Sequence, residues 1–499
     1  MELGTQPQTA DHAAMYRIVL ARDSRYDGRF FIGVRTTGVY CRPICRVRTP
    51  KPASCVFYSS AIAAQAAGFR PCLRCRPETA PALAAWNGTS TTVDRALALI
   101  ASGALDDDGV ERFAARLGLG DRHVRRLFRE HLGVTPVAVA QIRRVLFAKT
   151  LITDSAMSMA QIATASGFGS VRRFNEAIRG VYRRSPSDLR RGRVARDHGE
   201  PVTLRLAFAG AYDWNGIAAW LGARAIPGVE TIASDGRYVR AVSLNGKLGT
   251  IEVQPPQAGA RALVAVLRLG SLEVLHPAVE RVKRIFDLAA DVDAIETHLR
   301  ADPLLATSIA RRPGLRVPGA WDGFELAVRA VLGQQISVVA ATRLAGRLVE
   351  RFGTPLPERL RTVAGVDAVF PSPAQLAGAD VASIGMPGAR GAAIRGIAQA
   401  ALADPALFEP SHDLASSVAR LCALPGIGEW TAQYIAMRAL REPDAFPAAD
   451  IGLMRGLAVD GVRPNARDVA ARAEAWRPWR AYAALHVWAL DADREKERS

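Results

Sequence analysis

Residues 424–440 read LPGIGEWTAQYIAMRAL, and with the preceding SSVARLCAL (416–424) they predict two amphipathic helices joined by a tight turn. Gly426 and Gly428 let the backbone turn sharply and approach another backbone closely. The free amides at the start of the second helix then face outward, which suits a phosphate group. A lone LPGIG is an ordinary helix connector, so the residues around it must decide its role.

Three side chains at fixed offsets from this turn carry more information: Trp430 and Tyr434 on the second helix, and Asp450 in FPAADIGLMRGL (446–457). With them, the segment resembles the helix-hairpin-helix superfamily of DNA glycosylases. Over about residues 200–495 the chain resembles the AlkA-type 3-methyladenine DNA glycosylases. Its most specific pieces are AWDGFELAVRAVLGQQIS (320–337), IGMPGARGAAIRGIA (384–398) and WRPWRAYAALHVWAL (476–490).

The AlkA resemblance implies roles for five side chains. Asp450 matches the catalytic aspartate, whose negative charge stabilises the oxocarbenium-like sugar formed as the glycosidic bond breaks. Trp430, Tyr434 and Trp488 match aromatics of the base pocket, where a cationic alkylated purine gains about 0.5–2 kcal/mol of cation–π attraction. Gln335 matches a leucine that in some AlkA proteins fills the gap left by the flipped base. Asp450 as a simple helix N-cap is the plainer interpretation, and both roles can coexist.

The residues after the hairpin also limit the mechanism. Glycosylases that cut the strand place a lysine nucleophile just after the hairpin glycine, where this chain has Glu429 and Trp430. The resemblance therefore implies hydrolysis without strand cleavage. The iron–sulfur cysteines of some superfamily members are absent from the sequence, since only Cys422 lies near the hairpin.

The N-terminal part holds four of the six cysteines, in CRPIC (41–45) and CLRC (72–75). These paired knuckles have the spacing of a closed tetrahedral site and predict one Zn²⁺ bound by Cys41, Cys45, Cys72 and Cys75. Two unrelated turns are the plainer alternative, which the concentration of cysteines disfavours. Arginines surround both knuckles, where they can offset the two net negative charges of a tetrathiolate zinc or meet phosphates.

The stretches RYDGRFFIGVRTTGVYCRPICRVRTP (25–50) and AAGFRPCLRCRPE (66–78) resemble the N-terminal domain of Ada, the adaptive-response protein that repairs methyl phosphotriesters in DNA. The resemblance implies that Cys41 accepts a methyl group from a methylated backbone phosphate, because zinc keeps its sulfur as the nucleophilic thiolate. The product is a thioether, so the protein is consumed. Losing one negative charge would also favour tighter DNA binding. Spacing alone leaves a purely structural role for Cys41 open.

Two helix-turn-helix patterns follow, in residues 110–136 and 157–190, joined by a long helix around 137–151. The pair resembles the AraC-type regulatory DNA-binding domain, an interpretation favoured over two solvated arginine-rich helices because the motif is duplicated. The bases that it reads are not specified, because phosphate and base contacts use the same residue types. The candidate DNA-binding side chains of the two second helices are Arg122, Arg125, Arg126, Arg172, Arg173 and Asn175.

The charge of the chain is unevenly distributed. The net charge is +17, and residues 1–200 contain 31 Lys and Arg against 17 Asp and Glu, a net charge of +14 that leaves +3 for the rest. We therefore expect non-specific DNA affinity mainly in the N-terminal two-fifths. No apolar run reaches the length of a transmembrane helix, and the first residues lack a signal-peptide pattern. We expect a cytoplasmic, nucleoid-associated protein with no membrane partner.

These patterns predict a multidomain, mainly α-helical protein. We expect a small zinc-bound α/β domain (8–80), an AraC-type double helix-turn-helix domain (90–190), an α+β antiparallel-sheet domain (202–310) and an all-α helix-hairpin-helix glycosylase domain (311–495). Period-two patterning predicts the strands of the third domain, and AYDWNGIAAWLGARAI (211–226) its helix. The predicted strands are VTLRLAF (202–208), YVRAVSL (238–244), GTIEVQ (249–254) and ALVAVLRL (262–269).

The combined prediction is an alkylation-damage responder that acts on double-stranded DNA, both alkylated DNA and promoter sites, and that contacts RNA polymerase as an activator. The alternative is a transcription regulator whose glycosylase-like half binds DNA without excising bases. A zinc-sensing repressor is a third interpretation, which the closed four-cysteine site disfavours. The sequence has no Pro-Cys-His-Arg, the signature of the O6-alkylguanine acceptor domain of longer Ada proteins.

Overall fold

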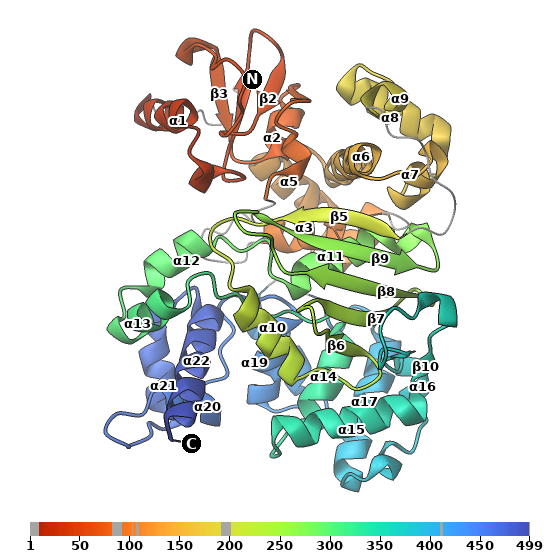
Figure 1. Cartoon of the computed structure of the whole chain (residues 1–499), viewed down its shortest axis with the longest axis vertical. Helices are drawn as coiled ribbons and strands as arrows, with labels where there is room; N and C mark the ends of the chain where they lie inside the picture. The colour runs from red at the N-terminus through yellow and green to blue at the C-terminus, as the bar shows by residue number, and fades with distance from the viewer. Residues whose placement is uncertain are drawn as a thin grey trace. The chain divides into compact units, whose positions relative to one another are not determined.

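The computed structural model describes residues 9–81, 92–101, 103–105, 109–190, 201–409 and 413–498 (Figure 1). The chain folds as two compact units. The first comprises residues 1–85, 96–209 and 261–280, and the second comprises residues 86–95, 210–260 and 281–499. The predicted domain ends at residues 8 and 90 lie outside the described residues.

The first unit begins with a small four-stranded sheet of order β3-β1-β2-β4 (red to orange in Figure 1). Strand β1 is antiparallel to β2 and β3, whereas β4 is parallel to β2. Gly33 in β1 is required by close packing, because a Cβ there would lie 2.8 Å from the Tyr58 ring and 2.9 Å from the Phe69 ring. The elements are α1 (Thr9–Ala21), β1 (Phe31–Val34), β2 (Val39–Cys41), β3 (Cys55–Tyr58), α2 (Ala61–Ala66) and β4 (Arg70–Pro71).

Two helix-turn-helix motifs follow in the same unit, as predicted. The turns contain Gly118 and Gly167, whose φ angles of 68° and 74° lie in the left-handed region that glycine adopts without steric cost. A capping box at Ser158 begins α7, and the Ser170 side chain caps α8. The helices are α4 (Val110–Arg116), α5 (Asp121–Leu132), α6 (Pro136–Asp154), α7 (Met159–Ala165), α8 (Val171–Tyr182) and α9 (Pro186–Leu189).

The first unit also contains strands β5 (Val202–Ala207) and β9 (Ala262–Leu269), which pair with each other in antiparallel orientation. Alternate residues of β5 are buried, as its period-two pattern predicts. Helices α3 (Thr92–Ala101) and α11 (Leu275–Ile285) have residues in both units. The short 3-10 helices of the chain are η1 (Ser24–Tyr26), η2 (Pro52–Ser54), η3 (Pro77–Thr79), η4 (Leu272–Val274), η5 (Glu358–Leu360), η6 (Val381–Ile384) and η7 (Glu474–Trp476).

The second unit contains an antiparallel meander of β6 (Glu230–Ile232), β7 (Tyr238–Leu244) and β8 (Lys247–Gln254), with helix α10 (Trp214–Ala223) before it. The strands predicted at 238–244 and 249–254 are confirmed as β7 and β8. The short strand β6 was not predicted, because three residues are too few for a period-two pattern.

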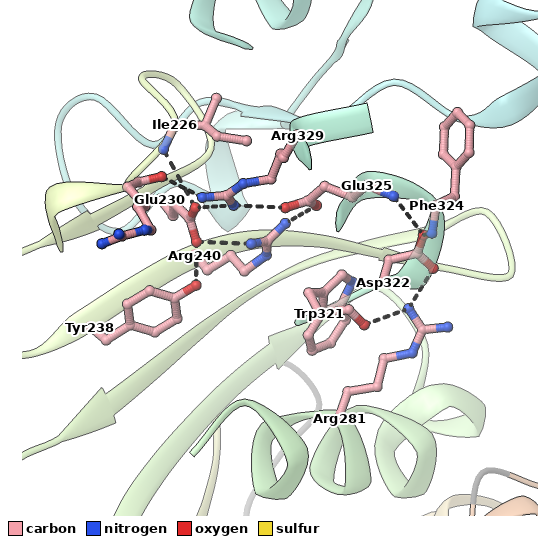
Figure 2. A network of polar contacts seen from close by, with 11 residues as sticks. Ile226, Glu230, Tyr238, Arg240, Arg281, Trp321, Asp322, Phe324, Glu325 and Arg329 are labelled. Carbon is pink, nitrogen blue, oxygen red and sulfur yellow. Dashed lines mark hydrogen bonds and ion pairs between the residues drawn. The ribbon is translucent and has the colours of Figure 1, made fainter. Parts of the chain in front are cut away.

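Three buried charged side chains (Glu230, Arg240 and Glu325) and the partly buried Arg329 join this meander to helix α14 (Gly323–Leu332), and we call these four the ion-pair ring (Figure 2). Arg240 pairs with both Glu230 and Glu325, and Arg329 donates to Glu230 at 2.7 Å and to Glu325 at 3.1 Å. Burial acts to raise the pKa of Glu230, but the two arginines outweigh it and lower that pKa to about 2. The ring therefore balances two positive charges with two carboxylates away from water.

The rest of the second unit is almost entirely helical. A large core gathers around Phe324 of α14, Ile435 of α19 and Val487 of α22. Among the described residues, no helix is both long and apolar enough to cross a bilayer. The remaining elements are α12 (Val292–Leu299), α13 (Pro303–Arg311), α15 (Val338–Phe352), β10 (Thr354–Pro355), β11 (Ala368–Val369), α16 (Pro373–Leu376), α17 (Gly388–Ala403), α18 (Leu414–Cys422), α19 (Glu429–Arg438), α20 (Ile451–Gly456), α21 (Ala466–Ala473) and α22 (Arg480–Arg498).

Candidate functional site

The four predicted zinc ligands come together in the first unit. Their sulfur atoms all lie within 4.8 Å of one another, and no disulfide joins them. Cys41 ends β2 and Cys72 directly follows β4, and the parallel register Tyr40↔Pro71 sets the two knuckles side by side. Four sulfurs at this separation fit a tetrahedral Zn²⁺ with Zn–S bonds of about 2.3 Å. Cys41, Cys45 and Cys72 are buried, whereas Cys75 is partly exposed.

The arginines around the knuckles divide into two groups. Arg42 donates its backbone N–H to the Cys75 sulfur at 3.4 Å, while its guanidinium pairs with Asp27 and donates to the Cys75 carbonyl at 3.2 Å. Arg76 pairs with Asp154 of α6 at 2.8 Å. Arg42 therefore supports the cluster directly, whereas Arg76 joins the segment after Cys75 to helix α6. The exposed ones, which remain available to phosphates, are Arg35, Arg46, Arg48 and Arg74.

The candidate DNA-binding side chains lie on α5 and α8. Arg122, Arg126, Arg172 and Arg173 are exposed, and Arg125 and Asn175 are half-buried. Intrahelical ion pairs engage some of them: Arg126 with Glu130 at 3.3 Å, and Arg172 with Glu176 at 3.0 Å. Surface pairs of this kind are worth less than about 1 kcal/mol, so they do not prevent contact with DNA. Their role in DNA binding stays a prediction.

In the second unit, Asp450 is held by three donors. Its Oδ1 accepts from the Leu453 amide at 3.0 Å and from Trp488 Nε1 at 2.8 Å, while its Oδ2 accepts from Trp430 Nε1 at 2.9 Å. The residue is thus the N-cap of α20 and also a carboxylate clamped between two indoles. Gly452 makes this arrangement possible, because a Cβ there would lie 3.0 Å from Asp450 Oδ1 and 3.1 Å from the Trp488 ring.

The carboxylate faces a cavity of about 1390 Å³ whose lining includes Trp430, Tyr434, Trp488 and Gln335. Trp430 and Tyr434 lie one turn apart on α19 and stack with ring centroids 5.5 Å apart and an angle of 7° between their planes. The structure therefore brings together all five residues that the sequence predicts for the base site. Gln335 sits exposed in the α14–α15 loop with a φ of 60°, a left-handed conformation uncommon for a residue with a Cβ.

The hairpin between α18 and α19 is built as predicted, although its two glycines differ. Gly426 has a φ of 81°, and a Cβ there would lie 2.6 Å from the Cβ of Ala393 on α17. Gly428 has no atom within 4 Å of such a Cβ, and it begins α19 without a side-chain cap. Both glycines are exposed, so uncapped helix amides face solvent there, as an anion site requires.

The cavity also contains residues that the sequence interpretation missed. Trp220 and Arg224 of the α10 segment line it, as does Arg438 of α19. The Arg224 guanidinium lies 3.6 Å from the centroid of the Trp220 ring, and Arg438 donates to the Tyr434 hydroxyl at 2.7 Å. Trp220 and Arg224 are four residues apart, as are Tyr434 and Arg438, so the sequence could have predicted that each pair shares a helix face. Nothing in the sequence, however, placed the 211–226 helix beside Asp450.

Four families match successive parts of the chain. Residues 14–78 match the metal-binding domain of Ada, and residues 113–192 match a helix-turn-helix domain. Residues 203–322 match the AlkA N-terminal domain, and residues 328–481 match the HhH-GPD superfamily of base excision DNA repair proteins. The order agrees with the predicted order of domains.

Similarity to curated relatives extends over nearly the whole chain. Over 484 residues it is 39% identical to a protein of Mycobacterium tuberculosis (strain CDC 1551 / Oshkosh) named a probable bifunctional transcriptional activator/DNA repair enzyme AlkA, with 96% of each chain covered. The chain belongs to this AlkA family. Escherichia coli DNA-3-methyladenine glycosylase 2 is 34% identical over 56% of this chain and 93% of its own length.

A solved structure of a 3-methyladenine DNA glycosylase from Archaeoglobus fulgidus shares the fold. It is 22% identical, with a TM-score of 0.50, and covers 58% of this chain and 98% of its own. In this member of the AlkA family, the match to the Ada metal-binding domain and the clustering of the four cysteines together identify a four-cysteine Zn²⁺ site. The predicted fold class, with its zinc, helix-turn-helix, antiparallel-sheet and helix-hairpin-helix parts, is confirmed.

Proposed function

We propose that the second unit excises alkylated bases such as 3-methyladenine from double-stranded DNA by hydrolysis. The observation that carries the proposal is the Asp450 carboxylate, held between the indole N–H groups of Trp430 and Trp488 at the wall of an aromatic cavity. A flipped purine fits such a cavity, since aromatic walls stack on its faces. The exposed hairpin glycines provide amides for the DNA backbone.

The proposed mechanism of base excision follows from the position of the negatively charged Asp450 carboxylate. As the bond between C1′ and the base nitrogen breaks, its electron pair leaves with the base and positive charge develops on the sugar. Asp450 stabilises that charge, and water then adds to C1′ and loses one proton to solvent. Trp430 cannot act as an amine nucleophile, and its N–H is engaged by Asp450. The product is therefore an intact strand with an abasic site.

We further propose that the first unit removes methyl groups from DNA methyl phosphotriesters. With Zn²⁺ bound by the four cysteines, the Cys41 sulfur stays deprotonated at neutral pH. This thiolate attacks the methyl carbon, and the C–O bond breaks with its electron pair going to the phosphate oxygen. A phosphodiester anion and S-methyl Cys41 result, so each protein molecule reacts once. The exposed arginines beside the knuckles support phosphate docking.

The third proposed activity is sequence-specific transcription activation through α5 and α8, with RNA polymerase as the partner. The basic character of residues 1–200 and the exposed arginines on both helices support it. Methylation of Cys41 lowers the negative charge that faces the phosphate, which favours tighter promoter binding. This ties repair of the backbone to regulation.

One experiment tests both repair activities of the full chain. The protein is incubated with duplex DNA treated with a labelled methylating agent, and free bases and protein-bound label are measured separately. We expect release of 3-methyladenine and one methyl group per protein on Cys41. DNA binding without any base release would instead support the alternative, a regulator whose glycosylase-like half only binds DNA.

A further inference from the structure

One wall of the base cavity carries an arginine with unused donors. Trp220 and Arg224 lie one helical turn apart in the α10 segment, and the Arg224 guanidinium covers the Trp220 ring at 3.6 Å. Among the described residues, its side chain donates to the Trp220 carbonyl at 3.5 Å and also hydrogen-bonds the Tyr434 side chain. A guanidinium has five N–H donors, so most of those of Arg224 remain available to a base in the cavity.

Arg438, another arginine of the cavity lining, has more of its donors engaged than Arg224. Arg438 donates to the Pro318 carbonyl at 2.8 Å, to the Gly319 carbonyl at 3.0 Å and to the Tyr434 hydroxyl at 2.7 Å. No carboxylate of the described residues forms an ion pair with either arginine. Burial acts to raise the pKa of Tyr434, but Arg438 and Arg224 outweigh it and hold that pKa below its usual value. Arg224 and Arg438 are thus two arginines of the cavity lining whose charges no ion pair offsets among the described residues.

The wall that presents Arg224 is held in place by the ion-pair ring. Arg329 donates to the Arg224 carbonyl as well as to Glu230 and Glu325. Glu230 also accepts from the Ile226 amide at 3.4 Å, as Figure 2 shows. Backbone atoms at Arg224 and Ile226 are therefore fixed by buried charges, so the guanidinium has a defined position in the cavity.

We propose that Arg224 determines which damaged bases the cavity releases, by stabilising the negative charge that an uncharged base acquires as it leaves. This inference rests on the proposed glycosylase function. When the C1′–N bond of an uncharged purine breaks, the electron pair goes to the base nitrogen and the base departs as an anion. Water supplies hydroxide to C1′, and its remaining proton ends on the base. Guanidinium donors suit the acceptor edge of a purine and strengthen as it gains charge.

A cationic alkylated base behaves in the opposite way. It leaves as an uncharged molecule and needs no such donor, and two nearby arginines repel it while it is bound. The sequence interpretation expects aromatic walls to favour a cationic purine, but the guanidinium of Arg224 already covers the Trp220 ring. Arg224 therefore shifts the selectivity of the cavity toward uncharged bases that carry a carbonyl or ring-nitrogen acceptor.

Single-turnover excision from two duplexes tests the inference, one with hypoxanthine as the uncharged base and one with 7-methylguanine as the cationic base. We expect Arg224→Gln to slow hypoxanthine release about 10-fold to 100-fold, the order lost with a donor that stabilises developing charge. Release of 7-methylguanine stays unchanged or rises. Arg224→Lys, which keeps the charge, recovers part of the hypoxanthine rate. An equal fall with both bases, or an unchanged hypoxanthine rate, would overturn the inference.

Arg359→Gln is the matched control, because Arg359 is exposed on η5 outside the cavity lining. A second measurement does not depend on catalysis: free hypoxanthine is titrated against the tryptophan fluorescence of the unaltered protein, Arg224→Gln and Arg359→Gln. Weaker binding of hypoxanthine by Arg224→Gln than by the other two proteins supports the inference, and equal affinities in all three contradict it. If the unaltered protein released neither these two bases nor 3-methyladenine from DNA, the glycosylase proposal would fail, while the titration would still decide the role of Arg224.

Discussion

The cysteine cluster and the Asp450 cavity are the two proposed reactive centres, and they are built in opposite ways. The cluster takes its four sulfurs from two short knuckles, and the pairing of β2 with β4 is enough to bring them together. The cavity draws its walls from helices between Trp220 and Trp488, and Asp450 depends on indoles from two of them. A local site suits the single-use nucleophile that we propose for Cys41, whereas a site with many walls suits the proposed enclosure and repeated release of a base.

The largest effect is expected at the cysteine cluster. Cys41→Ala should abolish methyl uptake from methyl phosphotriester DNA and leave base excision unchanged, because the two centres lie in different units. Labelled methyl on the protein and released bases report the two activities. Cys55→Ala is the control, since Cys55 is a buried cysteine outside the cluster. Zinc content must be measured for both variants, and methyl uptake by Cys41→Ala at the normal yield would exclude Cys41 as the acceptor.

The second effect concerns the cavity. Asp450→Asn should reduce excision of 3-methyladenine by about 10²–10³-fold, because the amide keeps the shape but lacks the charge that stabilises the sugar cation. Methyl uptake and binding to damaged DNA should stay near normal. Asp460→Asn, an exposed change ten residues along the chain, should excise normally. Near-normal excision by Asp450→Asn would remove Asp450 from the mechanism.

The two centres also differ in how far the sequence predicts them. Cysteine identity and knuckle spacing predict the whole cluster, because local spacing fixes the geometry. Asp450, Trp430 and Trp488 were found only through the family resemblance. Trp220 and Arg224 were not predicted as cavity residues, because the sequence of a helix far earlier in the chain does not indicate that it packs beside Asp450.

The ion-pair ring could not be predicted from the sequence for a related reason. In the sequence, Glu230, Arg240, Glu325 and Arg329 look like ordinary surface charges. Only the fold shows that they pair with one another and that three of them are buried. The helix-turn-helix motifs were predicted well because their glycine turns and apolar spacing are local signals. Burial of a charge depends on long-range packing, which periodicity does not report.

The third prediction concerns the stability of the second unit. Glu230→Gln should lower the free energy of unfolding by about 3–5 kcal/mol, because it leaves the buried Arg240 and the partly buried Arg329 with one carboxylate. Glu358→Gln, an exposed change, is the control, and urea unfolding at neutral pH is the measurement. A free energy equal to that of the unaltered protein would show that the ring is not a stabilising element.

The ring also predicts a dependence on pH. The pKa of Glu230 is lowered from 4.5 to about 2, so its contribution is fully present above pH 4.5 and is lost as the pH falls toward 2. The Glu230→Gln variant should lack this part of the acid dependence, which urea midpoints measured across that range would show.

The smallest expected effect is a difference in stability between alanine variants of the two hairpin glycines, Gly426 and Gly428. Gly426→Ala should cost roughly 1–2 kcal/mol for its left-handed backbone, and more if Ala393 cannot move away. Gly428→Ala meets no neighbouring atom and should be tolerated. Thermal unfolding and binding to abasic DNA measure the difference. Equal behaviour of the two variants would mean that the hairpin is not packed as described.

One measurement on the unaltered protein tests directly whether the two centres act independently. The protein is reacted to completion with a methyl phosphotriester duplex that contains no damaged bases, and mass spectrometry locates the added methyl group. Excision of 3-methyladenine from a second duplex is then timed before and after this reaction. We predict one methyl group, on Cys41, and the same excision rate in both states. A methyl group on another residue, or excision that stops once the cluster is methylated, would contradict the account.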